Sequence, residues 1–587
     1  MFRFDRRRLF TSNSSDKSGL LHFQLCVCLL VAPLFSTATG QTPVTLNRSA
    51  ALEGSLTPGT SHQYLLRLER GESAEIVVHQ QGVDVVVELR TPDGKLFASI
   101  DSPTGRNGDE VVEIMAQESG TYGITVRPFD GNEPAGIYRL EVKALRGTRE
   151  TAELLRTRQE ARSAAAQWLR PRSVPIARSG IIPTNANISL LDKLARRVRV
   201  LGLGEASHGS REFGDLRFSL TRYLIERQGF RVVALEASAS NLIQVASYIN
   251  GEGQLTPAMA RLIESKIWIG PRTRRELIEW VHRWNKEHPK DRVQVIGVDA
   301  NENPNARETL RAFLSQAYGE ALLKRWTVAE RELVAADEQT AVFGDSGVDA
   351  PTRQLLLEIV AMMKLDAPIL TSRFGAPSYN SALEAAQILT EFADFNSGAD
   401  AVINHSRDWY MAARVVRVLQ EKGMSAKAVY WAHNAHIVHP PGSNRTAGAL
   451  LRNTLGCEYG ALAVTFGEGA FVAEIPNDLE DRLAVSTLPP APDESLEAVL
   501  KDLRSDGSLA VWDCFAPATS NPQSIPEWLR RAQPMHWIGG LYTPGSLSSA
   551  AFRNFDLLRD FDGVVYLPRV TAEDIPTERP LIPARKR

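Results

Sequence analysis

Cysteine is scarce in this sequence. Only four cysteines occur in 587 residues, and Cys26 and Cys28 lie in the apolar stretch near the N-terminus. The other two, Cys457 and Cys514, could form one bridge in an exported protein, but they cannot define a disulfide framework. Two thiols are also too few for a metal site built from cysteine.

An excess of charge of one sign is lacking too. The chain has 67 Lys and Arg against 69 Asp and Glu, a formal net charge of −2. This balance gives no electrostatic reason to expect a nucleic-acid partner. Beyond the first 40 residues, no stretch is apolar enough to span a bilayer. The length allows two or more domains with substantial cores.

The common nucleophile and nucleotide motifs are missing. No G-x-S-x-G sequence occurs, which disfavours an ordinary serine α/β-hydrolase. There is no P-loop, and Gly202-x-Gly204 lacks the third glycine of a dinucleotide fingerprint. A hydrolase without a serine or cysteine nucleophile must activate water directly, through a histidine or a metal ion.

Residues 1–40 are typical of a cleaved signal peptide. Basic residues at 3–8 precede an apolar run at 20–35, and small residues follow at 38–40. The sequence therefore predicts export, to the periplasm or beyond, without stable membrane insertion after cleavage. An uncleaved membrane anchor is the alternative.

Residues 42–146 predict a small all-β sandwich, because short alternating runs are separated by Gly- and Pro-rich turns. This segment resembles the β-sandwich modules appended to secreted bacterial hydrolases. Residues 147–174 predict a helical linker, since the charged, alanine-rich segment 149–169 gives way to prolines.

Residues 175–587 predict an α/β domain with a mostly parallel sheet, flanking helices and a helical lobe. Buried β-branched runs alternate with helical segments, and such alternation is typical of parallel sheets. The region 306–389 is almost entirely helical in pattern and is expected to lie over one edge of the sheet. The predicted strands are 198–203, 231–235, 293–298, 427–432, 460–466, 509–514 and 563–567.

Ionisable residues occur where these strands end. Glu205 and His208 lie on the loop after strand 198–203, and Glu236 ends the next strand. Ligands bind at this edge of open parallel sheets. A histidine can take a proton from water near neutral pH if a carboxylate orients its ring. The pair therefore predicts His208 as general base and Glu205 as its partner, although a polar pair that fixes the loop is also possible.

Two histidines follow strand 427–432. His433 and His436 are three residues apart, a spacing that can ligate a metal in a helix. Direct contact with substrate is the favoured interpretation. His439 is expected to face solvent because two prolines follow it. In the first helix, Arg217 is expected to turn inward, where arginine can hold a carboxylate or polarise a carbonyl.

The segments GLGEASHGSREFGDLR, VVALEAS and VYWAHNAHI, with Arg407-Asp408, resemble the erythromycin esterase family over about residues 175–575. In that family the enzymes hydrolyse the lactone ester of macrolide antibiotics. The resemblance implies that His208 activates water without a covalent intermediate and that Glu205 orients it. It further implies that Arg217, Glu236 and His433 line the cleft, that His436 belongs to the site, and that no metal is required.

The sequence thus predicts an exported hydrolase of a small-molecule ester or macrolactone, without a cofactor, and the resemblance adds macrolide resistance as an expected role. The alternatives are a metal-dependent hydrolase using His433 and His436, and a non-catalytic ligand-binding protein. Clustered ionisable groups argue against simple binding. The prediction requires Glu205, His208, Glu236 and His433 to converge on one cleft. A separation of His433 from His208 above about 15 Å, well beyond any shared hydrogen-bond network, would contradict it.

Overall fold

The computed structural model describes residues 42–48, 50–100, 106–129, 133–177, 179–180, 182, 188–264, 270–299, 303–343, 348–395, 407–475, 483–512, 524–542 and 551–574. The predicted signal peptide and Cys514 lie outside these residues. Cys457 is disulfide-bonded. No helix within the described ranges is both long and apolar enough to cross a membrane.

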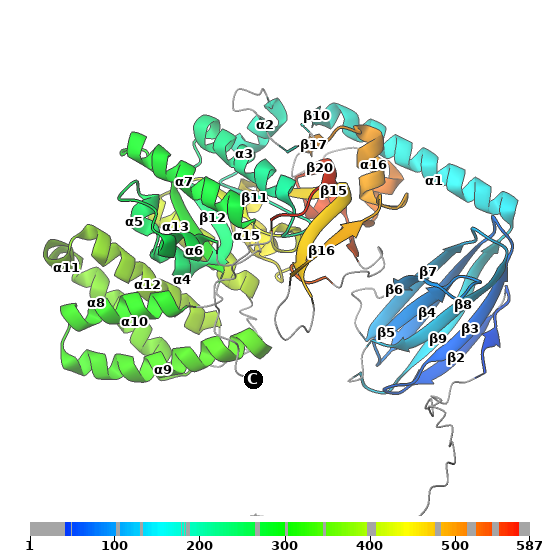
Figure 1. The fold of residues 1–587 in the computed structure, drawn as a ribbon, viewed down its shortest axis with the longest axis horizontal. Helices are drawn as coiled ribbons and strands as arrows, with labels where there is room; N and C mark the ends of the chain where they lie inside the picture. The colour runs from blue at the N-terminus through cyan, green and yellow to red at the C-terminus, as the bar shows by residue number, and fades with distance from the viewer. Residues whose placement is uncertain are drawn as a thin grey trace, which may run out of the picture.

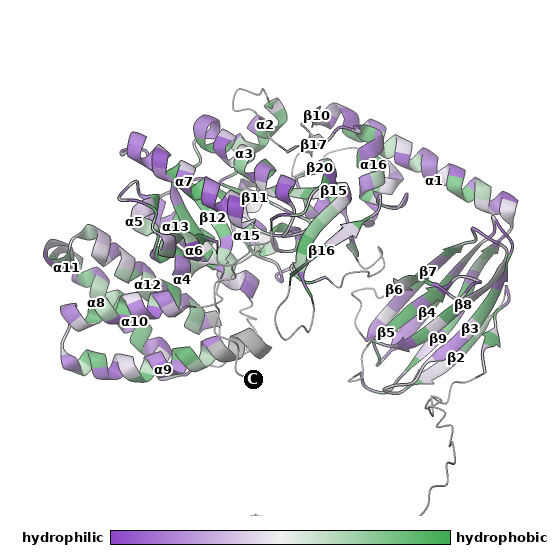
Figure 2. Cartoon of the chain, viewed as in Figure 1, coloured by the Kyte–Doolittle hydropathy of each residue, from purple (hydrophilic) through white to green (hydrophobic). Residues whose placement is uncertain are grey.

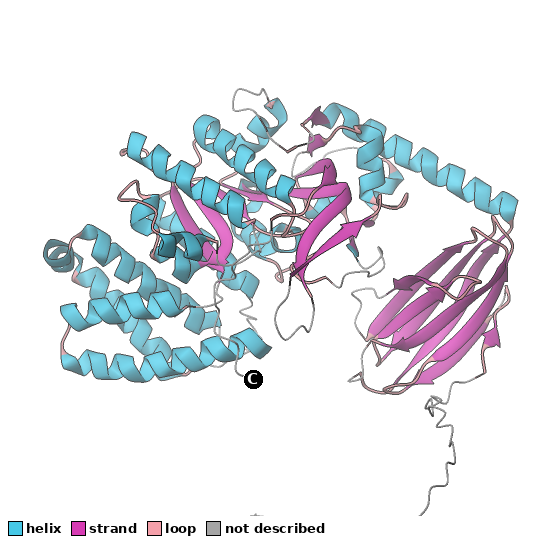
Figure 3. Ribbon diagram, in the orientation of Figure 1, coloured by secondary structure: helices cyan, strands magenta, loops and turns pink. Residues whose placement is uncertain are grey.

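The N-terminal part is a sandwich of two β-sheets (Figures 1 and 3). One sheet has the order β1-β3-β8-β5-β6 and the other β2-β9-β4-β7, with every pair antiparallel except β1 and β3. Polar and apolar residues alternate along these strands (Figure 2), so each sheet turns one apolar face inward. The strands are β1 (Val44–Thr45), β2 (Ala51–Leu56), β3 (His62–Leu68), β4 (Ser73–Gln81), β5 (Val85–Arg90), β6 (Leu96–Ile100), β7 (Asn107–Met115), β8 (Gly120–Pro128) and β9 (Gly136–Arg146).

A single long helix, α1 (Thr148–Leu169), runs from the sandwich to the rest of the chain (Figure 1). At its start, Thr151 donates a hydrogen bond to Ser73 of the sandwich, 3.0 Å away. At its end, Ala165 and Leu169 are buried in the core of the second domain. The helix therefore contacts both domains, one at each end.

The second domain is built on a sheet with the order β10-β17-β20-β15-β11-β14-β12-β13. Every neighbouring pair from β20 to β13 is parallel, whereas β17, β10 and the added strand β16 pair antiparallel. The strands are β10 (Ser173–Pro175), β11 (Val200–Leu203), β12 (Val232–Ser238), β13 (Gln294–Asp299), β14 (Ala428–Trp431), β15 (Tyr459–Glu474), β16 (Leu483–Leu488), β17 (Ser508–Val511) and β20 (Gly563–Val570). A separate hairpin pairs β18 (Gln533–His536) with β19 (Phe552–Phe555).

Helices cover both faces of this sheet, which explains why its parallel strands are apolar throughout. In β11, Leu201 and Leu203 belong to one core cluster, and Val200 belongs to the cluster on the other face. The first cluster includes residues of α2 (Ser189–Arg197), α3 (Arg211–Gln228) and α7 (Pro271–Glu287). The second includes residues of α1, α13 (Arg407–Lys422), α15 (Ala447–Leu455) and α16 (Leu496–Leu503).

Between β13 and α13 the chain forms a helical lobe with its own core (Figure 1). Trp326, Leu356 and Phe392 are fully buried there. The lobe consists of α8 (Pro304–Ala317), α9 (Glu320–Phe343), α10 (Ala350–Leu365), α11 (Ala367–Phe374) and α12 (Ala376–Phe395), with α4 (Ala239–Ile243) packed against it. The predicted fold class is confirmed: an α/β domain with a mostly parallel sheet and a helical lobe follows an all-β sandwich.

Candidate active site

The loop between β11 and α3 is buried and firmly held by its neighbours. Its carbonyl groups accept hydrogen bonds from the main-chain N–H groups of other segments: Asn434 to Glu205 (2.9 Å), Ile538 to Ala206 (2.7 Å) and Val472 to Gly209 (3.0 Å). A side chain at Gly209 would collide with the backbone of Val472. These contacts fix the main chain of the loop and thereby hold the side chains of Glu205 and His208 in position.

Glu205 and His208 form a buried pair on this loop. His208 Nδ1 lies 2.8 Å from Glu205 Oε1, and the side chains are 5% and 0% exposed. The other Glu205 oxygen is ion-paired with Arg217, whose guanidinium lies 5.1 Å from the centre of the Trp431 ring. Because Nδ1–H donates to the carboxylate, the basic lone pair of the neutral ring is on Nε2.

His433 lies beside His208, with ring centres 5.1 Å apart. It precedes the short helix α14 (Asn434–Ile437), and its Nδ1 accepts a hydrogen bond from the N–H of Ala435 at 3.1 Å. Its Nε2 must then carry the proton, which it donates to the carbonyl oxygen of Ala206 at 3.2 Å. Burial and the neighbouring His208 lower the pKa of His433 to about 3, so the ring is neutral.

Glu236, at the end of β12, connects His433 to a second group of charges. One carboxylate oxygen accepts the main-chain N–H of His433 at 2.8 Å, and the other accepts Nη2 of Arg407 at 2.9 Å. Arg407 also binds both oxygens of Asp299, at 3.0 and 2.9 Å. Burial alone would raise the pKa of Glu236, but His436 and Arg407 hold it well below its ordinary value.

His436 completes this second group. Its Nδ1 lies 2.9 Å from Asp408 Oδ1, and its Nε2 lies 3.3 Å from Glu236 Oε1. Burial lowers the pKa of His436, but Glu236 and Asp408 outweigh that effect and raise it to about 9. Nη1 of Arg407 is also 3.0 Å from Nε2, a contact that suits a neutral ring. We favour the charged ring, because three carboxylates surround these two basic groups.

The structure thus brings all six predicted residues to the ends of neighbouring strands. The predicted approach of His433 to His208 is confirmed, and Glu236 is bonded to His433. The sequence interpretation did not single out Asp299, and it named Arg407 and Asp408 only as part of the family resemblance, without a role in the site. The only available signal was their position, at a strand end and at a helix start.

The expectation for His439 was wrong. This residue is 4% exposed, and its Nε2 lies 2.9 Å from Asp562, which also binds Arg452 and Arg197. The chain reaches solvent only after His439, at Pro441 and Gly442, whereas the His439 ring packs edge-on against Tyr459, 5.8 Å between ring centres. His439 therefore belongs to a buried charge cluster at the start of β20.

The ring nitrogens of His433 and His436 already have partners in the protein, which limits their ability to ligate a metal ion. Both ring nitrogens of His433 hydrogen-bond to the main chain, and both nitrogens of His436 contact Asp408, Glu236 or Arg407. Within the described part of the chain, no group of three or more His, Cys, Asp and Glu side chains is arranged to hold a metal ion.

The sequence matches the family model described as erythromycin esterase over residues 225–570. This match includes Glu236, Arg407 and both histidines after β14, and it begins after the loop that carries His208. Two curated relatives are similar, both from Escherichia coli. Erythromycin esterase type II is 25% identical over 336 residues, 53% of this chain and 79% of the relative. Erythromycin esterase type I is 24% identical over 273 residues, 43% of this chain and 65% of the relative.

A solved structure of a succinoglycan biosynthesis protein is similar in fold. It is 18% identical, covers 71% of this chain and 100% of its own, and has a TM-score of 0.56. At this identity the likeness concerns the fold alone.

Proposed function

Because the chain belongs to the erythromycin esterase family, a membership that supports a hydrolase, we propose that it cleaves a carboxylic ester or macrolactone with histidine-activated water. The observation that carries this proposal is the buried pair of Glu205 and His208, 2.8 Å apart. A carboxylate on Nδ1 sets the tautomer in which Nε2 can accept a proton.

In the proposed reaction, Nε2 of His208 takes a proton from water as the water oxygen bonds to the ester carbonyl carbon. The carbonyl π electrons move to the carbonyl oxygen. When the carbon–oxygen bond to the alcohol breaks, the imidazolium returns its proton to the leaving oxygen. Glu205 stabilises the imidazolium through one oxygen, and Arg217 forms an ion pair with the other. Both interactions are strengthened because the groups are buried.

The contacts of the remaining site residues separate them into two groups, one that stabilises charge and one that positions other residues. Arg407 and His436 are 31% and 16% exposed and carry the positive charge of the second group. We assign them the role of stabilising the negative charge that develops on the carbonyl oxygen of the substrate. Both ring nitrogens of His433 bond to main chain. Glu236 binds the main-chain N–H of His433 together with Arg407 and His436. We therefore assign Glu236 and His433 positioning roles, in place of the direct substrate contact expected from the sequence.

A substrate panel tests this proposal. The purified chain is incubated with macrolides of different ring size and with simple carboxylic esters, and the released acid is measured. Hydrolysis of any ester that depends on His208 supports the proposal. Hydrolysis of macrolides would add a role in macrolide resistance. Absence of turnover across the panel, with ligands still bound, would favour a binding protein.

Export is also part of the proposal, on the composition of residues 1–40. Expression of the full chain in a bacterial host, followed by fractionation and N-terminal sequencing, tests it. The expected product is periplasmic or secreted and starts near Gln41. A full-length product in the membrane fraction would favour an uncleaved anchor.

A further inference from the structure

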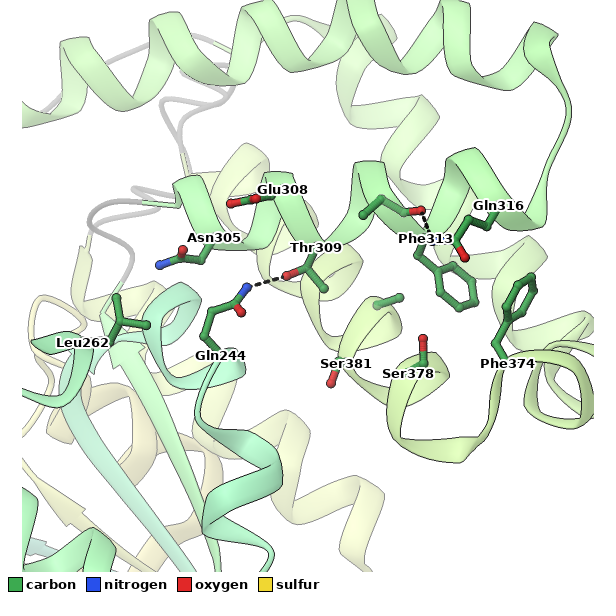
Figure 4. Close-up of a pocket in the computed structure, with 12 residues that line it drawn as sticks. Gln244, Leu262, Asn305, Glu308, Thr309, Phe313, Gln316, Phe374, Ser378 and Ser381 are labelled. Atoms are coloured by element: carbon green, nitrogen blue, oxygen red, sulfur yellow. Dashed lines mark hydrogen bonds between the residues drawn. The ribbon is translucent and has the colours of Figure 1, made fainter. Parts of the chain in front are cut away.

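The structure has a concave site that is lined by residues other than those of the candidate active site. It is a groove of about 420 Å³ between the lobe helices α8 and α12, the end of α11, and the segment after α4 (Figure 4). Small-molecule sites in proteins commonly have volumes of roughly 300–1,000 Å³. None of the six candidate active-site residues lines this groove.

The polar lining consists of groups that both donate and accept hydrogen bonds. Gln244, Asn305 and Gln316 contribute amides, and Thr309, Ser378 and Ser381 contribute hydroxyls. Some of this capacity is used within the protein: Gln244 donates to Thr309 at 2.9 Å, and Asn305 donates to Asn241 at 2.8 Å. Gln316 likewise donates to the carbonyl oxygen of Ala312 at 3.1 Å, so each of the three amides uses a donor within the protein.

The charge of the lining residues indicates which ligands the groove can accept. Glu308 is the only ionisable residue among the lining residues, and none of them is Lys, Arg or His. A phosphate or carboxylate ligand would meet a carboxylate without a compensating cation, so anions are disfavoured. One carboxylate is also too few for a calcium site, which takes six to eight oxygen ligands.

One end of the groove is aromatic. The rings of Phe313 and Phe374 are 5.2 Å apart between centres, and Figure 4 shows them beside Gln316 and Ser378. The guanidinium of Arg373 lies over the Phe374 ring, 4.9 Å from its centre, so the C–H face of a sugar ring would pack against the other face. Amides, hydroxyls and a single carboxylate surround this face, and each can hydrogen-bond to sugar hydroxyls.

We infer that this groove binds a neutral saccharide of one or two rings, with Phe374 under the sugar and Glu308 and Thr309 on its hydroxyls. The site is independent of the proposed esterase chemistry. It gives the helical lobe a binding function of its own.

The test titrates the full chain with maltose and cellobiose, and with glucose 6-phosphate as the anionic comparison, by calorimetry or saturation-transfer NMR. The expected affinity for a neutral disaccharide is on the order of 1 mM, and the phosphate should bind at least about tenfold more weakly. Phe374→Leu and Thr309→Val should each weaken disaccharide binding by about tenfold, a change of roughly 1.4 kcal/mol.

Thr327→Val is the matched control, because Thr327 is exposed on α9 and bonds only to the carbonyl of Leu323. It should leave binding unchanged, and none of the three variants should alter ester hydrolysis. The inference is overturned if neither disaccharide binds, if the phosphate binds as well as they do, or if Phe374→Leu and Thr309→Val bind like the control.

Discussion

His433 donates its Nε2–H to the carbonyl oxygen of Ala206, 3.2 Å away, and thereby holds the main chain between Glu205 and His208. The same carbonyl accepts the N–H of Ile538 at 2.7 Å. A histidine that looks like a second base in the sequence is thus bonded through both ring nitrogens to the backbone. Its contribution to the site is the position of His208.

This role predicts the behaviour of two substitutions at His433. His433→Phe keeps a ring beside His208 but removes both hydrogen bonds, so turnover should fall by about tenfold or more and stability by about 1–3 kcal/mol. His433→Gln can place an N–H near the Ala206 carbonyl and should recover much of both.

The pH–rate profile separates this role from catalysis by His433. A ring that is already neutral contributes no ionisation between pH 5 and 9, so both variants should keep the acid limb of the wild-type profile. An acid limb that disappears in His433→Gln would show that His433 itself titrates in the reaction.

Arg407 is predicted to be essential to the second group of charges. Arg407→Gln leaves the buried Asp299 and Glu236 without their shared cation, which should cost on the order of 3 kcal/mol in the free energy of unfolding. Arg325→Gln is the control, because Arg325 forms an exposed ion pair with Glu358 and should change stability by less than about 1 kcal/mol. Equal effects in urea unfolding would contradict the network.

The raised pKa of His436 predicts that the folded protein loses stability in mild alkali. Its pKa is raised from 6.5 to about 9 in the folded protein, so its contribution is fully present below pH 6.5 and is lost as pH rises through 9. The loss should be at most about 3 kcal/mol. Urea unfolding of the wild type between pH 6 and 10 should show this decline, and His436→Gln should lack it.

His288→Gln is the matched control for this measurement. His288 is exposed at the end of α7 and stacks on Trp284. It should keep the wild-type decline. A decline that persists unchanged in His436→Gln would assign the alkaline transition to another group.

Chelator treatment is predicted to leave hydrolysis unchanged. His433 could ligate a metal only by giving up its hydrogen bond to Ala206 or to Ala435, and His436 only by leaving Asp408 or Glu236. Activity is measured before and after dialysis against a chelator, and again after zinc is added. Loss of activity that zinc restores would support the metal-dependent alternative.

The sequence predicted the sheet and the site residues at the strand ends because both depend on local pattern. The apolar runs that become β11, β12 and β14 end directly before Glu205, Glu236 and His433. In a parallel sheet, successive strand ends meet at one edge. Their convergence therefore followed from the order of elements alone.

The charge network around Arg407 was not predictable in the same way. Arg407 meets Asp299 and Glu236 across separations of 108 and 171 residues, which no local pattern encodes. The direction of the ring nitrogens of His433 depends on main-chain groups of the loop and of α14. His439 was misjudged for the same reason, since its partner Asp562 lies 123 residues away.

The central claim is that His208 takes the proton from the attacking water, and turnover of His208→Ala tests it most directly. With the best ester of the substrate panel, kcat should fall by roughly 10²–10⁴-fold, the usual contribution of a general base. Thermal stability and substrate affinity should change much less, and rapid mixing of the wild type should show no acyl-enzyme burst. Near-normal turnover in His208→Ala, or a burst in the wild type, would contradict the mechanism.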